Sequence, residues 1–313
     1  MADLLTTLTT QGAVYDCSHW GRLRLTGGDR LKFLHNQTSN NCLILKPGQG
    51  ADTVFLTSTA RTLDLATVLV HQEWVDLLVS PQRRAFLLQW LDKYIFFGDD
   101  VQVSDLTASS YCYRLFGEVA HTIRHTLGLP EFTTPYQHVT VAQGGRSLTV
   151  AATSGLALPG FTLWSDRPLT DWLGTYPQLQ DPEWEHIRIR QGRPAADAEL
   201  TEDYNPLEAR LGHTLSFDKG CYIGQETIAR LNTYQGVKQH LWGLDLNGCV
   251  TVPTPLFLAG EKVGLLTSCT PLGSGAFGLG YVRTKVGGAG LTLQVSSNRQ
   301  AQVVEVPFLR TVA

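Results

Sequence analysis

The run of residues 219–230 constrains the fold more tightly than any other stretch of this chain. Gly220 and Gly224 stand on either side of Cys221, and glycine is the residue that most readily adopts a positive φ and allows close backbone approach. The residues that follow favour a helix over 225–231. The run therefore predicts a tight turn that leads into a short helix.

Cys221 is the residue of this turn that can carry chemistry. Lys219, two positions earlier, favours the reactive thiolate if the site is partly exposed. The first N–H groups of a helix behind a glycine-rich turn also favour an anion. A buried, inert cysteine fits the same residues, because free cysteines are usually buried. Glu226 and Arg230 are spaced for an ion pair on one helix face. The candidate residues of the run are Lys219 and Cys221, supported by Gly220, Tyr222, Gly224, Gln225, Glu226 and Arg230.

Length and charge limit the classes of protein to consider. The chain has 313 residues, enough for two or three domains, and 43% of them are apolar. Its net charge is −3, from 25 basic and 28 acidic residues. This balance gives no general electrostatic reason to bind a nucleic-acid backbone. We therefore expect no direct nucleic-acid partner.

The six cysteines are spaced too widely for a metal site. None of them forms a C-x-x-C pair, so we expect neither a zinc nor an iron–sulfur centre. A chain of this length and apolar content does not need a disulfide framework. The first residues lack the pattern of a secretory signal, and no apolar run approaches the ~20 residues that span a bilayer. These features predict a cytoplasmic, reduced protein without membrane contact.

The order of predicted elements indicates an α+β fold followed by a β-barrel. Up to residue 237, strands with period-two patterns alternate with amphipathic helices, which favours ferredoxin-like or antiparallel sheet subdomains. The remainder consists of short strands separated by glycine and proline, which is typical of a small barrel. We predict one domain boundary near Val237, between 1–237 and 238–313. Helices are expected over 4–11, 30–35, 82–94, 118–127 and 182–191, and strands over 21–27, 52–57, 63–70, 74–79, 101–103, 111–115, 138–141, 147–152 and 161–164.

Two further stretches carry candidate binding residues. The first holds Trp20, with Asp16 and His19 as supporting residues of the same stretch, although a plain loop entering a strand fits the same residues. The second holds Trp184 and Arg188, which are four apart and share one helical face. An aromatic ring beside a guanidinium suits a flat ligand with a carboxylate tail. A half-buried tryptophan beside a solvated arginine is the alternative.

The motif of residues 219–230, K-G-C-Y-x-G-Q-E followed by arginine, resembles the signature of the YgfZ family, folate-binding relatives of the glycine-cleavage T-protein. D-x-S-H-x-G at residues 16–21 and W-x-x-x-R-I-x-x-G-x-P at residues 184–194 also resemble family blocks, in the family's order. The resemblance covers most of residues 14–245 and is looser in the barrel. It implies a T-protein-like fold, tetrahydrofolate or another reduced folate as ligand, and Trp20, Trp184 and Arg188 as its contacts.

Carboxylates that T-proteins use are missing here. An alignment to the T-protein strand that carries the catalytic carboxylate puts Leu65 at that position, with Asp64 one residue earlier. On a strand, one residue of offset turns a side chain to the opposite face. The T-protein loop Y-T-G-E-x-G-x-E corresponds to residues 156–162, which contain no glutamate. These changes argue against aminomethyl transfer on this fold.

The family motifs and the missing T-protein carboxylates together predict a folate-binding accessory protein. The family implies support for iron–sulfur cluster assembly or repair in client enzymes, including radical enzymes that modify tRNA, with Cys221 as the functional thiol. A folate-dependent one-carbon transferase descended from T-protein is one alternative. A folate-binding scaffold without chemistry of its own is another.

Overall fold

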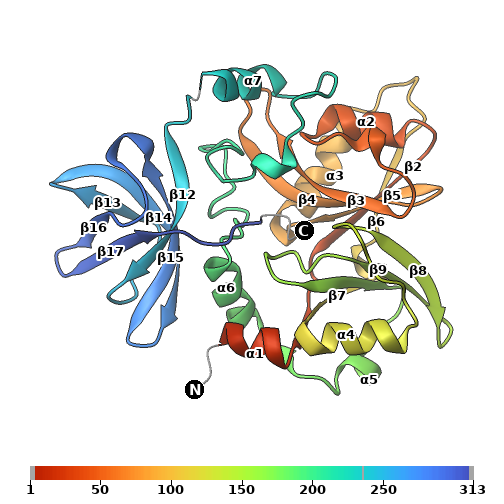
Figure 1. Cartoon of the computed structure of the whole chain (residues 1–313). Coiled ribbons are helices and arrows are strands. Elements are labelled where there is room, and N and C mark those ends of the chain that lie inside the picture. The colour runs from red at the N-terminus through yellow and green to blue at the C-terminus, as the bar shows by residue number, and fades with distance from the viewer. Residues whose placement is uncertain (1–3, 235, 310–313) are drawn as a thin grey trace.

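The first lobe is a five-stranded antiparallel sheet in the order β3-β4-β5-β2-β6. The structure, a computed structural model, describes residues 4–234 and 236–309. Helices α2 and α3 cover one face of this sheet and bury their apolar residues against it (Figure 1). The elements are β2 (Gly21–Thr26), α2 (Arg30–Gln37), β3 (Gln49–Leu56), β4 (Thr62–Val70), β5 (Trp74–Val79), α3 (Arg84–Lys93) and β6 (Gln102–Asp105).

The second lobe is a six-stranded sheet in the order β11-β1-β7-β10-β9-β8, antiparallel except for the β1–β11 pair. Strand β1 precedes the whole first lobe in the chain, so the two lobes are interleaved in sequence. Apolar residues of α4 and α5 form a core cluster with this sheet. The elements are α1 (Leu4–Thr10), β1 (Ala13–Asp16), β7 (Tyr111–Phe116), α4 (Gly117–Thr126), β8 (His138–Gln143), β9 (Arg146–Ala151), β10 (Gly160–Ser165), α5 (Thr170–Leu173) and β11 (Gln178–Leu179).

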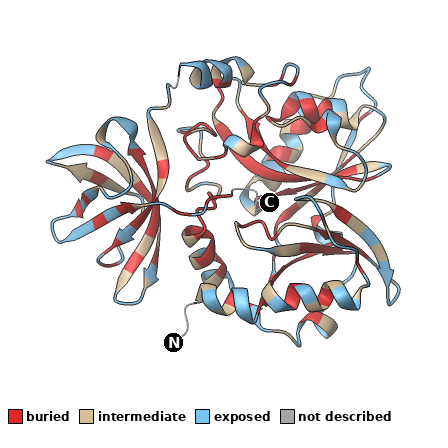
Figure 2. Cartoon of the chain, viewed as in Figure 1, coloured by how far each residue is buried: buried red, intermediate tan, exposed pale blue. Residues whose placement is uncertain are grey.

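The third part is a closed barrel in the order β12-β15-β14-β13-β16-β17. Helices α6 (Asp181–Arg190) and α7 (Gln225–Thr233) lie in the segment between the second lobe and the barrel. After the last strand the chain runs back toward the lobes, where Val306, Phe308 and Leu309 are buried (Figures 1 and 2). The strands are β12 (Gln239–Leu246), β13 (Thr254–Leu258), β14 (Glu261–Leu272), β15 (Gly275–Arg283), β16 (Thr292–Ser296) and β17 (Arg299–Val304).

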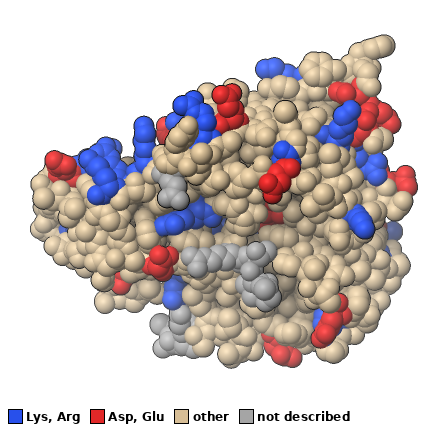
Figure 3. All heavy atoms as spheres, turned by 45° about the horizontal axis from the view of Figure 1, so that its top comes forward, with Lys and Arg blue, Asp and Glu red and all other residues tan. Residues whose placement is uncertain are grey.

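The predicted α+β fold with a C-terminal barrel is confirmed, as are the predicted helices to within a few residues. Strands β1 and β11 and helix α5 were not expected; all three are very short, and brief segments carry little periodicity. In the described part of the chain, no helix is long and apolar enough to cross a membrane. Acidic and basic side chains are interspersed on the face shown in Figure 3.

Candidate functional site

The turn before α7 depends on Gly224, which adopts the left-handed conformation with φ of 84°. A Cβ atom there would lie 2.8 Å from the carbonyl oxygen of Thr57, closer than real Cβ contacts. The predicted helix is confirmed as α7. Of the two glycines that permit a positive φ, Gly224 adopts one and Gly220 does not.

Lys219 is buried and anchors this turn to the end of helix α2. Its ammonium group donates hydrogen bonds to the carbonyl oxygens of His35, Thr38 and Asn40 at 2.6, 2.6 and 2.7 Å. All three ammonium protons therefore have a main-chain acceptor. Burial lowers the pKa of Lys219 to about 8, and the nearby thiol of Cys42 opposes that shift. The structure thus gives Lys219 an anchoring role, and tuning of Cys221 stays a prediction.

The thiol of Cys221 is exposed at this turn. Tyr222, in contrast, is buried, and the Lys219 ammonium lies 4.5 Å from the centre of its ring. The side-chain oxygen of Gln225 accepts a hydrogen bond from the Tyr222 N–H at 3.3 Å. Ion pairs within residues 4–234 and 236–309 do not include the predicted Glu226–Arg230 pair. Exposure removes the buried, inert alternative for Cys221.

The two predicted tryptophans meet, although they are far apart in the sequence. The ring centres of Trp20 and Trp184 are 6.2 Å apart at an interplanar angle of 86°, and Tyr15 stacks on Trp184 at 4.7 Å. The guanidinium carbon of Arg114 lies 4.5 Å from both tryptophan ring centres. All four side chains are buried. They form a cation–π cluster between β1, β7 and α6.

Asp16 and His19 lie at the edge of this cluster. The Asp16 carboxylate accepts a hydrogen bond from the Ser18 N–H at 2.9 Å, which shapes the turn after β1. The His19 ring meets Tyr15 edge-on at 6.3 Å. Both residues are exposed. Their contacts hold the loop that places Trp20.

Arg188 lies one helical turn after Trp184 in α6, but its guanidinium does not join the tryptophans. Its guanidinium donates to Glu199 at 2.8 Å and to Ser268 of the barrel at 2.7 Å, and it also pairs with Glu185. Glu199 is fully buried and needs a cation as its partner. This requirement directs Arg188 toward the barrel. Its role in folate binding stays a prediction that the geometry does not favour.

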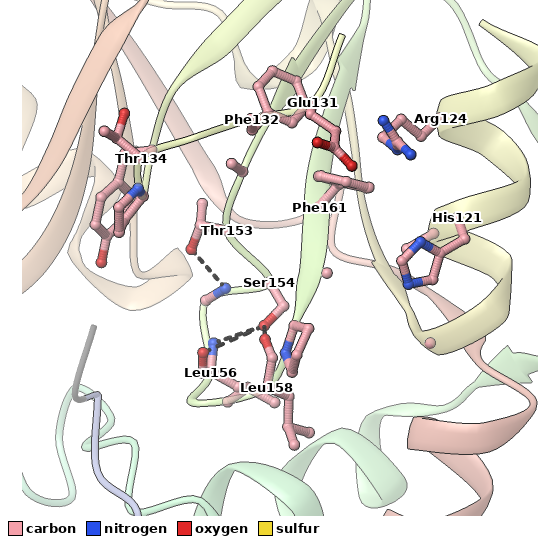
Figure 4. Close-up of a pocket in the computed structure, with 18 of the residues that line it drawn as sticks. His121, Arg124, Glu131, Phe132, Thr134, Thr153, Ser154, Leu156, Leu158 and Phe161 are labelled. Carbon is pink, nitrogen blue, oxygen red and sulfur yellow. Dashed lines mark hydrogen bonds between the residues drawn. The ribbon is translucent and has the colours of Figure 1, made fainter. Parts of the chain in front are cut away.

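A cavity of about 390 Å³ opens in the second lobe. Its walls are helix α4, residues 131–136 and residues 152–161. Figure 4 shows His121 and Arg124 projecting from α4 toward the cavity, with Phe132 and Phe161 on another side. The lining is mostly apolar with a few polar groups, as small-molecule sites are. Sequence reasoning missed this cavity: it matched residues 156–162 to a T-protein loop, but only the fold brings that loop together with α4 and residues 131–136.

Two buried arginines connect the tryptophan cluster to the wall of this cavity. Arg114 donates to the Ser154 carbonyl at 2.9 Å, and Arg193 donates to the Gly155 carbonyl at 2.7 Å. A Cβ atom on Gly155 would lie 1.7 Å from a nitrogen of Arg114. Burial, together with the charge of Arg114, lowers the pKa of Arg193 to about 10. The tryptophans therefore support the cavity wall from behind and do not line it.

Tyr136 lines the cavity and connects it to Asp52 of β3 in the first lobe. Burial raises the pKa of its hydroxyl well above the ordinary value, and the hydrogen-bonded carboxylate of Asp52 adds to the effect. Asp52 in turn accepts a hydrogen bond from Thr67 of β4 at 2.6 Å. A ligand in the cavity would thus be in contact with a residue connected to the first lobe.

Leu65 and Asp64, which the sequence resemblance places at and beside the T-protein carboxylate position, are both buried. Leu65 is buried in an apolar cluster. Asp64 is also buried, but its carboxylate accepts hydrogen bonds from the N–H and hydroxyl of Ser80 at 2.8 and 2.7 Å. Residues 156–162, which the resemblance matches to the T-protein loop, contain no carboxylate. Thr162 donates its hydroxyl proton to the Thr153 carbonyl at 2.6 Å.

Known proteins resemble the chain over nearly its whole length. It is 41% identical to the Arabidopsis thaliana protein "Putative transferase At1g60990, chloroplastic" over 307 residues, which are 95% of this chain and 71% of that protein. The chain belongs to the aminomethyltransferase-like family. The aminomethyltransferase of Halalkalibacterium halodurans is 24% identical over 96% of this chain and 87% of its own length. No protein-family model matches.

A solved structure shows the aminomethyltransferase-like fold directly. The glycine cleavage system aminomethyltransferase T from Bartonella henselae superimposes with a TM-score of 0.82, covering 97% of this chain and 88% of that one, at 18% identity. The interleaved lobes and the barrel are therefore the arrangement of this family. At that identity, the likeness concerns the fold alone.

Proposed function

We propose that this member of the aminomethyltransferase-like family is a reduced-folate-binding accessory protein of the YgfZ type. It would support iron–sulfur cluster assembly or repair in client enzymes, including radical enzymes that modify tRNA. The observation that carries the proposal is the exposed Cys221 thiol in the motif of residues 219–230. The thiol is available to a client, and the sequence resemblance assigns Leu65, which is apolar and buried, to the position of the T-protein carboxylate.

The cavity beside α4 is the site we propose for the folate. Its volume of about 390 Å³ falls within the range of about 300–1,000 Å³ typical of small-molecule pockets. Phe132 and Phe161 offer apolar ring surfaces to a pterin. Arg124 and His121 offer donors to the carboxylates of the folate tail. Tetrahydrofolate would thus be oriented by this lobe, and Trp20 and Trp184 would act by supporting the wall.

Calorimetric titration with tetrahydrofolate tests this site. We expect Arg124→Ala to weaken binding by about tenfold or more, because a hydrogen bond from a charged donor is worth about 1.5–3 kcal/mol. His121→Ala should weaken it less. His125→Ala, one turn along the same helix but outside the cavity lining, should bind like the wild type. If Arg124→Ala bound tetrahydrofolate with wild-type affinity, the proposal that folate binds in this cavity would be refuted.

The role of the thiol is tested in cells that lack their own YgfZ-type protein. Cys221→Ala should keep the fold and tetrahydrofolate binding but lose support of an iron–sulfur client. Cys249→Ala removes another exposed free thiol and should retain full support. Full support by Cys221→Ala, with folate binding intact, would instead identify a scaffold without thiol chemistry.

A one-carbon transferase is the second candidate, because relatives with aminomethyltransferase in their names match the chain over nearly all of its length. Purified protein would then catalyse folate-dependent exchange of ammonia or formaldehyde. Turnover above that of the heat-inactivated protein would favour this candidate over the accessory role. A cytoplasmic location stays a prediction; the name of the Arabidopsis relative places that protein in the chloroplast.

A further inference from the structure

Two cysteines that are 20 positions apart in the sequence meet at one end of the barrel. Cys249 lies in the loop after β12, and Cys269 lies near the end of β14. Their sulfur atoms are 3.6 Å apart, and both are free thiols. The loop of Cys249 leads into β13, which pairs with β14, so the closed barrel brings this loop beside the strand of Cys269.

The two thiols differ in their surroundings. Cys249 is exposed, whereas Cys269 is half-buried and packs with Val250 against the apolar core of the barrel. Asn247, at the start of the loop, is held to β17 by Gln300 and Arg299. The loop is therefore fastened at one side to β17, and on the other side it rests against Cys269.

We propose that Cys249 and Cys269 form a reversible disulfide, with a low-molecular-weight disulfide as the oxidant. In a reducing compartment, disulfides are usually transient and respond to redox conditions. Closing the link requires the sulfur atoms to move from 3.6 Å to a bond length of about 2.05 Å. The Cys249 side chain is exposed, so its thiol can turn toward Cys269 at the surface of the barrel.

The chemistry proceeds by two thiol–disulfide exchanges. The Cys249 thiolate attacks the oxidant, forms a mixed disulfide and releases one thiolate. The Cys269 thiol then loses its proton and attacks the Cys249 sulfur, which releases the second small thiolate; that thiolate takes up the proton. Two electrons pass from the protein to the oxidant. Burial and the neighbouring Cys249 thiol raise the pKa of Cys269 to about 11, which makes Cys249 the first attacking group.

The other cysteines do not combine contact with access. The sulfur atoms of Cys17 and Cys112 are only 3.2 Å apart, but both side chains are buried between β1 and β7. Cys42 is also buried. Cys221 is exposed, yet it makes no thiol–thiol contact within the described ranges. Among the described residues, the pair at the barrel end alone offers two neighbouring thiols to an oxidant in solvent.

The link would act on the strand that joins the barrel to the lobes. Cys269 stands between Ser268 and Thr270 of β14. The Ser268 hydroxyl donates a hydrogen bond to the Glu199 carboxylate at 2.6 Å, and the Thr270 hydroxyl lies 3.2 Å from a ring nitrogen of His186 in α6. Oxidation would therefore fasten the barrel-end loop to the strand that carries these contacts.

The test uses the full-length protein, reduced and then exposed to oxidised glutathione under native conditions. After alkylation of the remaining thiols and tryptic cleavage, peptides 239–262 and 263–283 should be recovered as one disulfide-linked species, about 2 Da lighter than their sum. Dithiothreitol should separate them. Cys249→Ser should abolish the linked species without affecting the fold, because the side chain is exposed.

The remaining cysteines provide internal controls. Cys221 should acquire a glutathione adduct, which shows that the oxidant reaches exposed thiols. Cys17 and Cys112 should stay reduced until the protein is unfolded in guanidinium chloride. The proposal is overturned if Cys249 and Cys269 carry separate adducts, or are alkylated individually, while Cys221 is glutathionylated.

Discussion

Replacing Asp64 by asparagine should change how the stability of the protein depends on pH. Asp64 is fully buried beside Ser80, and burial raises its pKa from 3.8 to about 6. Folding therefore strengthens proton binding to this carboxyl. Below the pKa of Asp64 in the unfolded chain, the carboxyl is protonated in both states, so it does not lower the free energy of unfolding. As the pH rises, the unfolded chain releases its proton first, and stability is lost until the pH passes the folded value.

The magnitude follows from the two pKa values. A rise from 3.8 to about 6 on folding corresponds to about 3 kcal/mol lost between low pH and neutral pH, at about 1.4 kcal/mol per pKa unit. About 1.3 kcal/mol of this loss falls between pH 5 and pH 7. Asparagine has a similar shape and does not titrate, so the Asp64→Asn variant lacks this component of the pH dependence.

Urea unfolding of both proteins, followed by tryptophan fluorescence at a series of pH values, measures the difference. The free energy of unfolding of the wild type, minus that of Asp64→Asn, should fall as the pH rises through this window. Any constant offset from altered hydrogen bonds to Ser80 cancels in the slope. Parallel curves for the two proteins would refute a raised pKa of the buried Asp64 carboxyl.

Two further substitutions test the cavity wall and the junction with the barrel. Gly155→Ala should lower the free energy of unfolding by about 3 kcal/mol or more and weaken tetrahydrofolate binding, because the new methyl group would overlap Arg114. Gly128→Ala is the control: Gly128 also has a positive φ but open space around it, so the loss should be only about 1–2 kcal/mol. Glu199→Gln should cost about 3–5 kcal/mol, because it removes the buried one of the two carboxylates that pair with the buried Arg188 guanidinium. Glu185→Gln, at the half-exposed partner, should cost under about 1 kcal/mol. Chemical denaturation measures all four, and equal losses within either pair would contradict the assigned contacts.

The sequence by itself determined the order and type of most elements. Alternation with period two along β2 and the glycine and proline residues that separate short strands after residue 237 are local patterns, and local patterns suffice to predict strands and a barrel. The motif around Cys221 likewise led to the family. Lys219 and Arg188 show the limit of such patterns, because the partners of a side chain are decided by chain segments far away in sequence.

Only the tertiary structure decided where the chemistry can take place. Packing β1, β7 and α6 together places Arg114 between two tryptophans and directs both buried arginines to the cavity wall, a contact set that no spacing in the sequence encodes. The same holds for Cys249 and Cys269, which carry no ligand or disulfide motif and meet only because the barrel closes. Local order follows from neighbours along the chain, whereas sites follow from long-range packing, in which each buried charge or thiol contacts whatever the fold brings beside it.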